Sequence, residues 1–161
     1  MIRHLTPQYV EGFIECYIQV FKSLYEILPD EYVTKQIREA SQGEYYYRVL
    51  GLLDDPSNIL LISHQSREIT GIAWGNVKGE LGWLGFMGVK KLFRRRGIGR
   101  SLLNRFIGEA KIKGAAMLSL DTHSSLITAI RLYESEGFKR KGMVENPYGL
   151  ELILFSKKLI I

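Results

Sequence analysis

The sequence predicts an α/β to α+β fold, in which helices cover both faces of a mixed β-sheet. Helical periodicity dominates the first third of the chain, three strand-like segments follow one another between residues 59 and 89, and helix and strand alternate in the remainder. The 161 residues contain no repeat and no linker long enough to separate two domains. We therefore expect one domain over residues 1–161.

The first part of the chain predicts one short strand and then helices. Thr6 and Pro7 form a good N-cap and N1 pair for the first helix. The expected elements are a strand at residues 1–5, a helix from there to about Phe21, a second helix from about Asp30 to about Ser41, and one or two helical turns at residues 45–53 before Pro56.

The rest of the chain predicts three strands and then an alternation of helices and strands. The three strands lie at residues 59–63, 70–77 and 81–89, separated by short turn signals. The next element is a helix that ends at a C-cap, Gly114, and whose inner face carries Ile98, Leu102, Leu103, Phe106, Ile107 and Ala110. A strand at 116–121 follows, and then a second helix, capped by Ser124 or Ser125 and ended by Gly137, whose inner face carries Leu126, Ile130 and Tyr133. Two closing strands are expected at 138–144 and 150–159.

Positive charge is concentrated in one segment. The net charge is +5, and six basic residues without an intervening acid lie between Lys90 and Arg100. The rest of the chain, with 16 basic and 17 acidic residues, carries a net charge of −1. A local cluster of this kind indicates a phosphate-bearing ligand, although a solvated surface segment has the same composition.

Other site types are not favoured by the composition. Cys16 is the single cysteine, which fits a reducing, cytoplasmic location. The three histidines have no ligand-spaced partners, so we expect no metal. No signal peptide and no apolar segment of about 18 residues is recognisable, and we expect no membrane partner.

Glycine spacing gives the first functional indication. Gly82, Gly85 and Gly88 recur every three residues in a strand whose side chains alternate every two. Glycines inside a strand mark a bulge or a place where a backbone or a ligand comes close.

The turn after this strand has the features of a phosphate site. Gly97 and Gly99 stand where the strand leads into a helix, and the first turn of a helix offers free N–H groups and a positive dipole. The segment departs from a P-loop, which needs Lys-Ser/Thr after its last glycine, and from the dinucleotide fingerprint, which needs glycine where Leu102 stands.

The chain resembles the GNAT superfamily of acyl-CoA-dependent N-acetyltransferases in two motifs. These are Arg94-x-x-Gly97-x-Gly99 and, some thirty residues later, "AIRLYESEGF" at residues 129–138. The resemblance is detailed over residues 83–138 and extends loosely over the whole chain. It implies a mixed, mostly antiparallel central sheet and acetyl-CoA as the cosubstrate.

The resemblance also implies roles for particular residues. The strand residues Phe86, Met87, Gly88 and Val89 would pair with the pantetheine arm, and Arg94, Arg95, Arg96, Gly97, Ile98, Gly99, Arg100 and Ser101 would surround the pyrophosphate. Tyr133 matches the tyrosine that faces the cofactor sulfur and would protonate the departing thiolate. The family often has Asn seven residues before this tyrosine, where this chain has Leu126, so Ser124, Ser125 or Thr128 would have to replace its hydrogen bond.

Amine acetylation also needs a base, because an alkyl amine with a pKa near 10.4 is only about 0.04% neutral at pH 7. Glu80, Asp121 and His123 lie near strand ends, and Asp121 is favoured because its strand should lie beside the cofactor strand.

The acceptor is left open by the sequence. Residues 21–32 and 144–151 should shape its site, and the first of these segments is acidic and aromatic, which suits a cationic amine and equally suits ordinary helix capping. A small-molecule amine and a peptide or protein amine both fit, and a homodimer is neither indicated nor excluded. Two other functions are considered: a non-catalytic acyl-CoA sensor and a nucleic-acid-binding module. The second leaves the glycine strand and the Tyr133 motif unexplained, so a nucleic-acid partner is not favoured.

Overall fold

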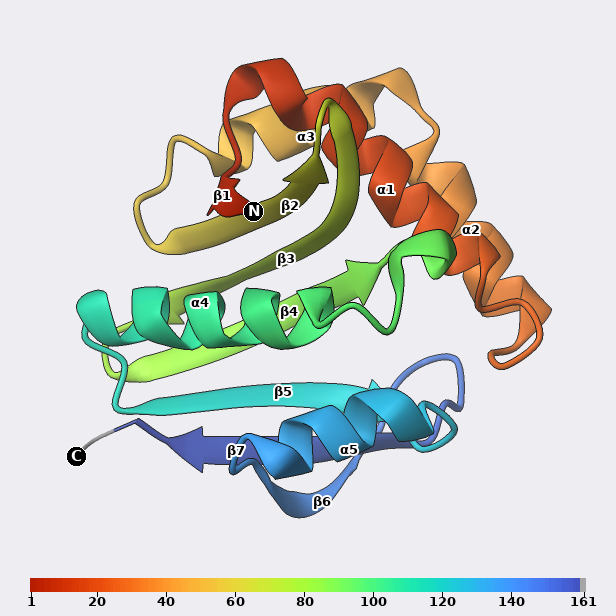
Figure 1. The fold of residues 1–161 in the computed structure, drawn as a ribbon. Coiled ribbons are helices and arrows are strands. Elements are labelled where there is room, and N and C mark those ends of the chain that lie inside the picture. The colour runs from red at the N-terminus through yellow and green to blue at the C-terminus, as the bar shows by residue number, and fades with distance from the viewer. Residues whose placement is uncertain (160–161) are drawn as a thin grey trace.

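A computed structural model describes residues 1–159, which form one seven-stranded sheet flanked by helices (Figure 1). The strand order is β1-β2-β3-β4-β5-β7-β6, and within the described residues β4 and β5 are the parallel neighbours. The strands are β1 (Ile2–His4), β2 (Asn58–Gln65), β3 (Glu68–Lys78), β4 (Leu81–Val89), β5 (Met117–His123), β6 (Lys139–Val144) and β7 (Leu152–Lys158). The expected mixed, mostly antiparallel sheet is confirmed.

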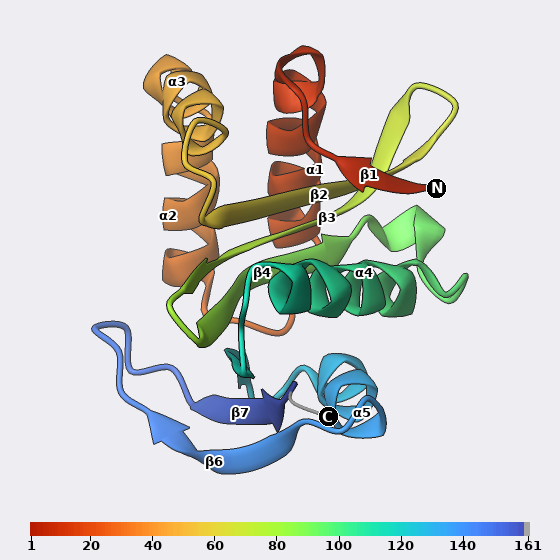
Figure 2. The same ribbon diagram turned by 90° about the vertical axis from the view of Figure 1, so that its left-hand side faces the viewer.

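Helices cover both faces of this sheet, as the sequence predicts. They are α1 (Val10–Lys22), α2 (Asp30–Ala40), α3 (Gly43–Leu52), α4 (Ile98–Ile112) and α5 (Ile127–Ser135), with 3₁₀ turns η1 (Pro7–Tyr9) and η2 (Lys91–Phe93). Figure 2 shows α1, α2 and α3 on one side of strands β2 to β4 and α4 on the other. The segment at residues 43–52 is a full helix, longer than the one or two turns expected.

Alternate side chains of β2 enter two separate cores. Leu60 and Ile62 pack with α1, α2 and α3, whereas Ile59 and Leu61 pack with α4 on the opposite face. Because successive side chains of a strand point to opposite faces, a strand covered by helices on both sides reads as a continuous apolar run. This explains the sequence "ILLI" at residues 59–62.

A β-bulge interrupts the pairing of β4 with β3. Trp74 pairs with Phe86 and Gly75 pairs with Leu84, so Gly85 is the additional residue. A Cβ atom on Gly75 would lie 1.9 Å from the carbonyl oxygen of Trp83, so this close approach requires glycine. The bulge that the glycine spacing predicts in β4 is therefore present.

Thr6 and Pro7 occupy the predicted N-cap and N1 positions, at the 3₁₀ turn η1 that precedes α1. The side chain of Thr6 makes no capping hydrogen bond, and its Oγ1 atom is buried without a partner among the described residues. Helix α5 begins at Ile127, after Leu126, so neither Ser124 nor Ser125 caps it. Instead, the Ser124 hydroxyl donates to Glu151, and the Ser125 N–H donates to Nδ1 of His123. The predicted serine cap of α5 is therefore wrong.

Candidate functional site

Strands β4 and β5 pair at one end and separate at the other. Parallel pairing joins residues 81–83 of β4 to residues 117–119 of β5. Beyond Trp83, β4 remains paired with β3 and β5 remains paired with β7, and the two strands diverge (Figure 1). Within the described structure, the edge of β4 after Trp83 that faces β5 has no partner strand. Such an edge can pair its main-chain groups with an extended ligand.

The diverging end of β4 leads through η2 into a turn before α4. Gly97 has a φ of +80° and immediately precedes the first helical residue, Ile98. Arg95 has a φ of +65°, a left-handed conformation that costs a residue with a Cβ roughly 1–2 kcal/mol. The turn places the first N–H groups of α4, which lack intrahelical acceptors, at the end of the strand. This is an anion-binding arrangement.

The helix start lies close to both β4 and α5. A Cβ atom on Gly99 would lie 3.9 Å from Cγ2 of Val89 and 3.6 Å from Cδ2 of Leu132. The structure therefore brings together the free strand edge, the glycine turn and the helix that carries Tyr133.

Three of the six clustered basic side chains are bound to protein groups. Nζ of Lys90 donates to Glu15 at 2.7 Å and to Glu68 at 3.3 Å, and the Lys90 side chain is only 10% exposed. Arg94 donates to the carbonyl oxygen of Val89 at 2.9 Å and to the Ser23 hydroxyl at 2.7 Å. An ion pair of 3.0 Å joins Arg100 to Glu136 at the end of α5.

The other three basic side chains remain exposed or half-exposed. Lys91, Arg95 and Arg96 form no ion pair within residues 1–159, and Arg96 lies 5.2 Å from the centre of the Phe93 ring. Lys90 and Arg100 are thus paired with carboxylates, whereas Arg94 is bound to neutral groups and keeps its charge.

Tyr133 presents a buried ring whose hydroxyl has no protein partner. The ring packs against Phe138 and Phe155, with ring centres 5.9 Å and 6.4 Å away, and the residue is 6% exposed. Among the described residues no group forms a hydrogen bond with the hydroxyl, yet this oxygen is not fully sealed from solvent. Burial raises the pKa of the phenol, and the nearby Asp121 carboxylate raises it further. The group therefore keeps its proton at neutral pH.

Asp121 approaches the same opening from the other face of the sheet. Along β5, Leu118 and Leu120 face α4 and α5, so Asp121 faces the side of α1 and α2. Burial raises the pKa of the Asp121 carboxyl, and the charge of this carboxylate raises the pKa of both Tyr133 and Tyr32. A partly desolvated carboxylate thus lies near a protonated phenol.

Aromatic side chains lie beside Asp121 on the α2 side. The ring of Tyr32 lies 5.2 Å from that of Tyr148 in the β6–β7 connection and 6.1 Å from that of Phe21. Lys35 donates a hydrogen bond to the Tyr148 hydroxyl. The two segments expected to shape an acceptor site, residues 21–32 and 144–151, therefore meet here.

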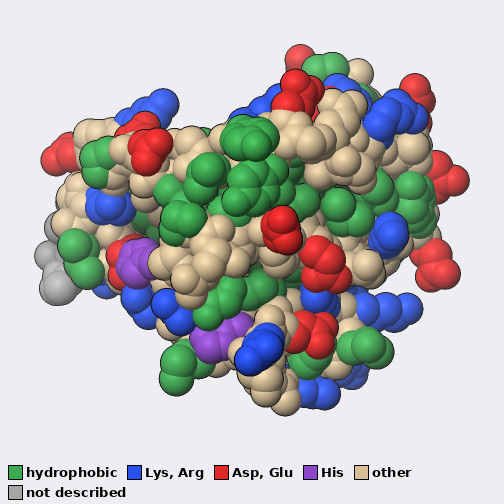
Figure 3. Space-filling model, turned by 90° about the horizontal axis from the view of Figure 1, so that it is seen from above, with side chains coloured by type: hydrophobic (Ala, Val, Ile, Leu, Met, Phe, Trp, Pro, Cys, Tyr) green, Lys and Arg blue, Asp and Glu red, His purple; other side chains and the backbone are tan. Residues whose placement is uncertain are grey.

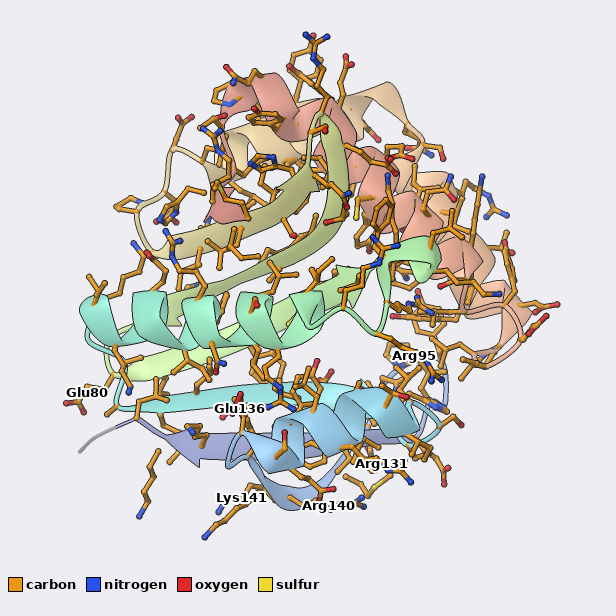
Figure 4. The ribbon with its side chains drawn as sticks, in the orientation of Figure 1. Glu80, Arg95, Arg131, Glu136, Arg140 and Lys141 are labelled. Atoms are coloured by element: carbon orange, nitrogen blue, oxygen red, sulfur yellow. The ribbon has the colours of Figure 1, made fainter. Side chains whose placement is uncertain are left out.

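The other two candidate bases are placed less favourably. Glu80 is exposed on the turn before β4, at the end where β4 and β5 are paired, and Figure 4 shows it far from Arg95. A strand of this length spans about 25 Å, so Glu80 does not reach the opening. His123 uses its Nδ1 to accept from the N–H of Ser125.

Ser124 and Thr128, two of the residues considered as substitutes for the family's asparagine where this chain has Leu126, have other surroundings. The Ser124 hydroxyl is directed to Glu151, at 3.1 Å, and Thr128 is exposed on α5. Leu126 is the N-cap residue of α5 and contributes no side-chain cap.

Two surface hollows lie away from this opening. One, of about 810 Å³, lies between α1 and the α2–α3 connection, and the other, of about 660 Å³, lies beside α2 and Tyr148. Figure 3 shows the molecule from above, where apolar side chains lie among charged groups of both signs, on the side opposite β5, α5 and β7. Only the second hollow, through Tyr148, adjoins the residues around Asp121.

Within residues 1–159, no group of three or more His, Cys, Asp or Glu side chains is arranged to hold a metal ion. No helix in the same range has the length and apolarity needed to span a membrane.

These features define a protein that opens one sheet between two strands and places an anion-binding helix start beside the opening. Residues 21–138 match the acetyltransferase (GNAT) family. This match covers more than half of the chain, and the chain belongs to that family.

Similar proteins agree with this assignment. Over 56 residues the chain is 43% identical to the [ribosomal protein bS18]-alanine N-acetyltransferase of Salmonella typhimurium. This matched segment covers 35% of this chain and 38% of that protein. The chain thus matches well under half of the length of this relative.

Two solved structures share the fold over almost their whole length. PaiA N-acetyltransferase from Thermoplasma acidophilum, in complex with coenzyme A, has a TM-score of 0.84 and 21% identity, with 98% of each chain covered. YncA from Salmonella typhimurium, with its cofactor acetyl-CoA, has a TM-score of 0.74 and 20% identity, covering 100% of this chain and 94% of that one. The expected family and fold are confirmed, and acetyl-CoA as cosubstrate is supported at the level of the family.

We expect Gly99→Val to weaken coenzyme A binding at least about tenfold, which corresponds to the loss of one charge-assisted hydrogen bond of about 1.5 kcal/mol. The branched side chain would enter the space between Val89, Leu132 and the first turn of α4. The measurement is a calorimetric titration with coenzyme A. Gly108→Val is the matched control, because Gly108 lies on the same helix with nothing within 4 Å of an added Cβ. Equal affinities in the two variants would place the phosphates elsewhere.

Proposed function

We propose that this protein transfers the acetyl group of acetyl-CoA directly to an amine while both substrates are bound. The observation that carries the proposal is the approach of Asp121 and Tyr133 to one opening from opposite faces of the sheet. One group can take a proton from the attacking amine, and the other can give a proton to the leaving thiolate.

The cofactor would lie along the free edge of β4. Main-chain groups of Met87 and Val89 are suited to pair with the amides of the pantetheine arm. The turn from Arg94 to Arg100, with Ser101 one residue further on, would hold the pyrophosphate on backbone N–H groups of the α4 start. Lys91, Arg95 and Arg96 would add charge at the rim, where salt screens it.

The reaction would need two protons to leave the acceptor nitrogen and one to reach sulfur. Asp121 would take the first proton from the bound ammonium and pass it to solvent, and the neutral nitrogen would then form a bond to the thioester carbonyl carbon. As the carbon–sulfur bond breaks, the Tyr133 hydroxyl would supply a proton to sulfur, and the second proton of the nitrogen would restore the phenol. Burial raises the pKa of Tyr133, and burial in the same opening would also raise the pKa of the thiol. Tyr133 therefore enters the reaction in its protonated form, as a proton donor must.

The acceptor would enter from the side of α1 and α2. Asp121 supplies negative charge there, and the rings of Tyr32 and Tyr148 can hold an ammonium group by cation–π attraction. Peptide N-terminal amines are the first acceptors to examine, because a relative modifies an alanine of a ribosomal protein. With a pKa of about 7.7–8.0, such an amine also needs less deprotonation than a lysine side chain.

The first experiment measures thermal unfolding with coenzyme A and then thiol release from acetyl-CoA across an amine panel. A ligand at a hundredfold excess over its Kd stabilises the folded state by about 2.7 kcal/mol, so we expect a clear rise in Tm. The single cysteine, Cys16, is buried and adds no background thiol. The panel contains peptide N-termini, lysine side chains, polyamines and amine antibiotics.

Two results would contradict the proposal in different ways. A Tm unchanged at millimolar coenzyme A would remove the cofactor site. A raised Tm without thiol release from any amine would indicate a non-catalytic acyl-CoA sensor.

We expect Tyr133→Phe to lower kcat roughly 10²-fold, because it removes the proton donor and keeps the ring. Affinity for coenzyme A and the Tm should change little, since the hydroxyl has no hydrogen-bond partner within residues 1–159. Tyr45→Phe is the control, because Tyr45 is similarly buried, at 7% exposure, in the other core. A wild-type kcat in Tyr133→Phe, with chemistry limiting turnover, would remove Tyr133 from the mechanism.

We expect Asp121→Asn to lower kcat at pH 7 by about 10²-fold, with a deficit that shrinks as the pH approaches the pKa of the amine. The neutral amine then forms without a base. Burial raises the folded-state pKa of Asp121, so folding favours the protonated carboxyl, and the charged form destabilises the protein above the unfolded-state pKa of about 3.9. Removing this charge should therefore leave the Tm at pH 7 unchanged or higher.

The matched comparison is Glu80→Gln, because Glu80 lies at the end where β4 and β5 are paired. This variant should retain the wild-type rate at every pH. If Glu80→Gln showed the pH-dependent deficit instead of Asp121→Asn, the assignment of the base would be wrong.

A further inference from the structure

Arg94 connects the glycine turn to the end of α1. Its Nε donates to the carbonyl oxygen of Val89 at 2.9 Å, and its Nη2 donates to the hydroxyl of Ser23 at 2.7 Å. The Ser23 hydroxyl in turn donates to the carbonyl oxygen of Val20 at 2.6 Å. A continuous chain of hydrogen bonds therefore runs from the last turn of α1 to the segment before α4.

Ser23 is well placed to anchor this chain. It is the C-cap residue of α1, and its own N–H is bonded to carbonyl oxygens of the helix end. Helix α1 packs closely on β4, since a Cβ atom on Gly88 would lie 2.7 Å from Val20. The anchor is thus fixed to the strand that leads into the turn.

The turn itself has little internal support. Arg95 and Gly97 both have positive φ angles, and Arg94 N–H makes a long contact of 3.4 Å with the carbonyl oxygen of Lys91. The left-handed conformation at Arg95 is unfavourable in isolation, so contacts from outside the turn must hold it. Among the described residues, the guanidinium of Arg94 provides such contacts on both sides.

We propose that Ser23 is a positioning residue for cofactor binding, which acts by holding Arg94 and, through it, the shape of the glycine turn. Two N–H groups of Arg94 donate hydrogen bonds to protein acceptors, so a main role of this side chain is to shape the turn. The inference rests on the proposed cofactor site at residues 94–100. A turn held in its binding conformation before the ligand arrives binds more tightly, because less ordering accompanies association.

Ser41 offers a control from the same chain. It is the C-cap residue of α2, and its hydroxyl donates to the carbonyl oxygen of Ile37 at 2.7 Å, as the Ser23 hydroxyl does to that of Val20. The Ser41 hydroxyl has no contact with the glycine turn. Ser23→Ala and Ser41→Ala therefore remove the same capping bond, and the first also removes the bond to Arg94.

The experiment is a calorimetric titration of each full-length variant with coenzyme A, together with its Tm and its KM for acetyl-CoA. We expect Ser23→Ala to raise the Kd for coenzyme A about three- to tenfold, the range for one hydrogen bond. Ser23→Thr, which keeps the hydroxyl, should bind as the wild type does. Ser41→Ala should lower the Tm without changing the Kd.

A double-mutant cycle tests whether Ser23 acts through Arg94. In an Arg94→Gln background, Ser23→Ala should change the Kd no further, because the partner of the hydroxyl is already absent. Equal Kd values for Ser23→Ala and Ser41→Ala, or a full additional effect of Ser23→Ala in the Arg94→Gln background, would overturn the inference. Coenzyme A binding that is unaffected by Gly99→Val would instead overturn the proposed cofactor site itself.

Discussion

The loss of pairing between β4 and β5 after Trp83 is the constraint on which the rest of the site depends. The bulge at Gly85 lies where β4 leaves its parallel neighbour, while the other edges of both strands stay paired. A sheet that would otherwise be closed thus gains an opening lined by main-chain groups. The glycine turn, Asp121 and Tyr133 are all placed relative to this opening.

Basic residues in the segment 90–100 have a larger structural role than their charge suggests. Lys90 joins β4 to α1 and β3 through two carboxylates, and Arg100 joins α4 to α5 through Glu136. Arg94 links the turn to α1. A turn with left-handed residues needs contacts from outside to hold its shape, and the bonds of Lys90, Arg94 and Arg100 to protein groups supply them. The basic cluster is therefore partly a frame for the turn.

Local patterns predicted the fold, whereas long-range partners were not predictable. Glycine spacing in β4 indicated the bulge, and the succession of helices and strands indicated a mixed sheet with helices on both faces. The contacts of Lys90 with Glu15 and of Arg94 with Ser23 join residues 75 and 71 positions apart, and no local signal marks them. Glu80 was named as a base because strand ends are visible in a sequence, but the sequence does not show which end of β4 lies at the opening.

The opening in the sheet also has an evolutionary consequence. Its edge and the adjoining helix start consist of backbone groups, which every amino acid carries, so most side chains along them can be exchanged without altering the geometry. Such a dependence on backbone geometry is compatible with a TM-score of 0.84 to a structure from Thermoplasma acidophilum at 21% identity. Divergence in such a protein is expected to concentrate in the segments that meet the acceptor, where side chains decide what is recognised.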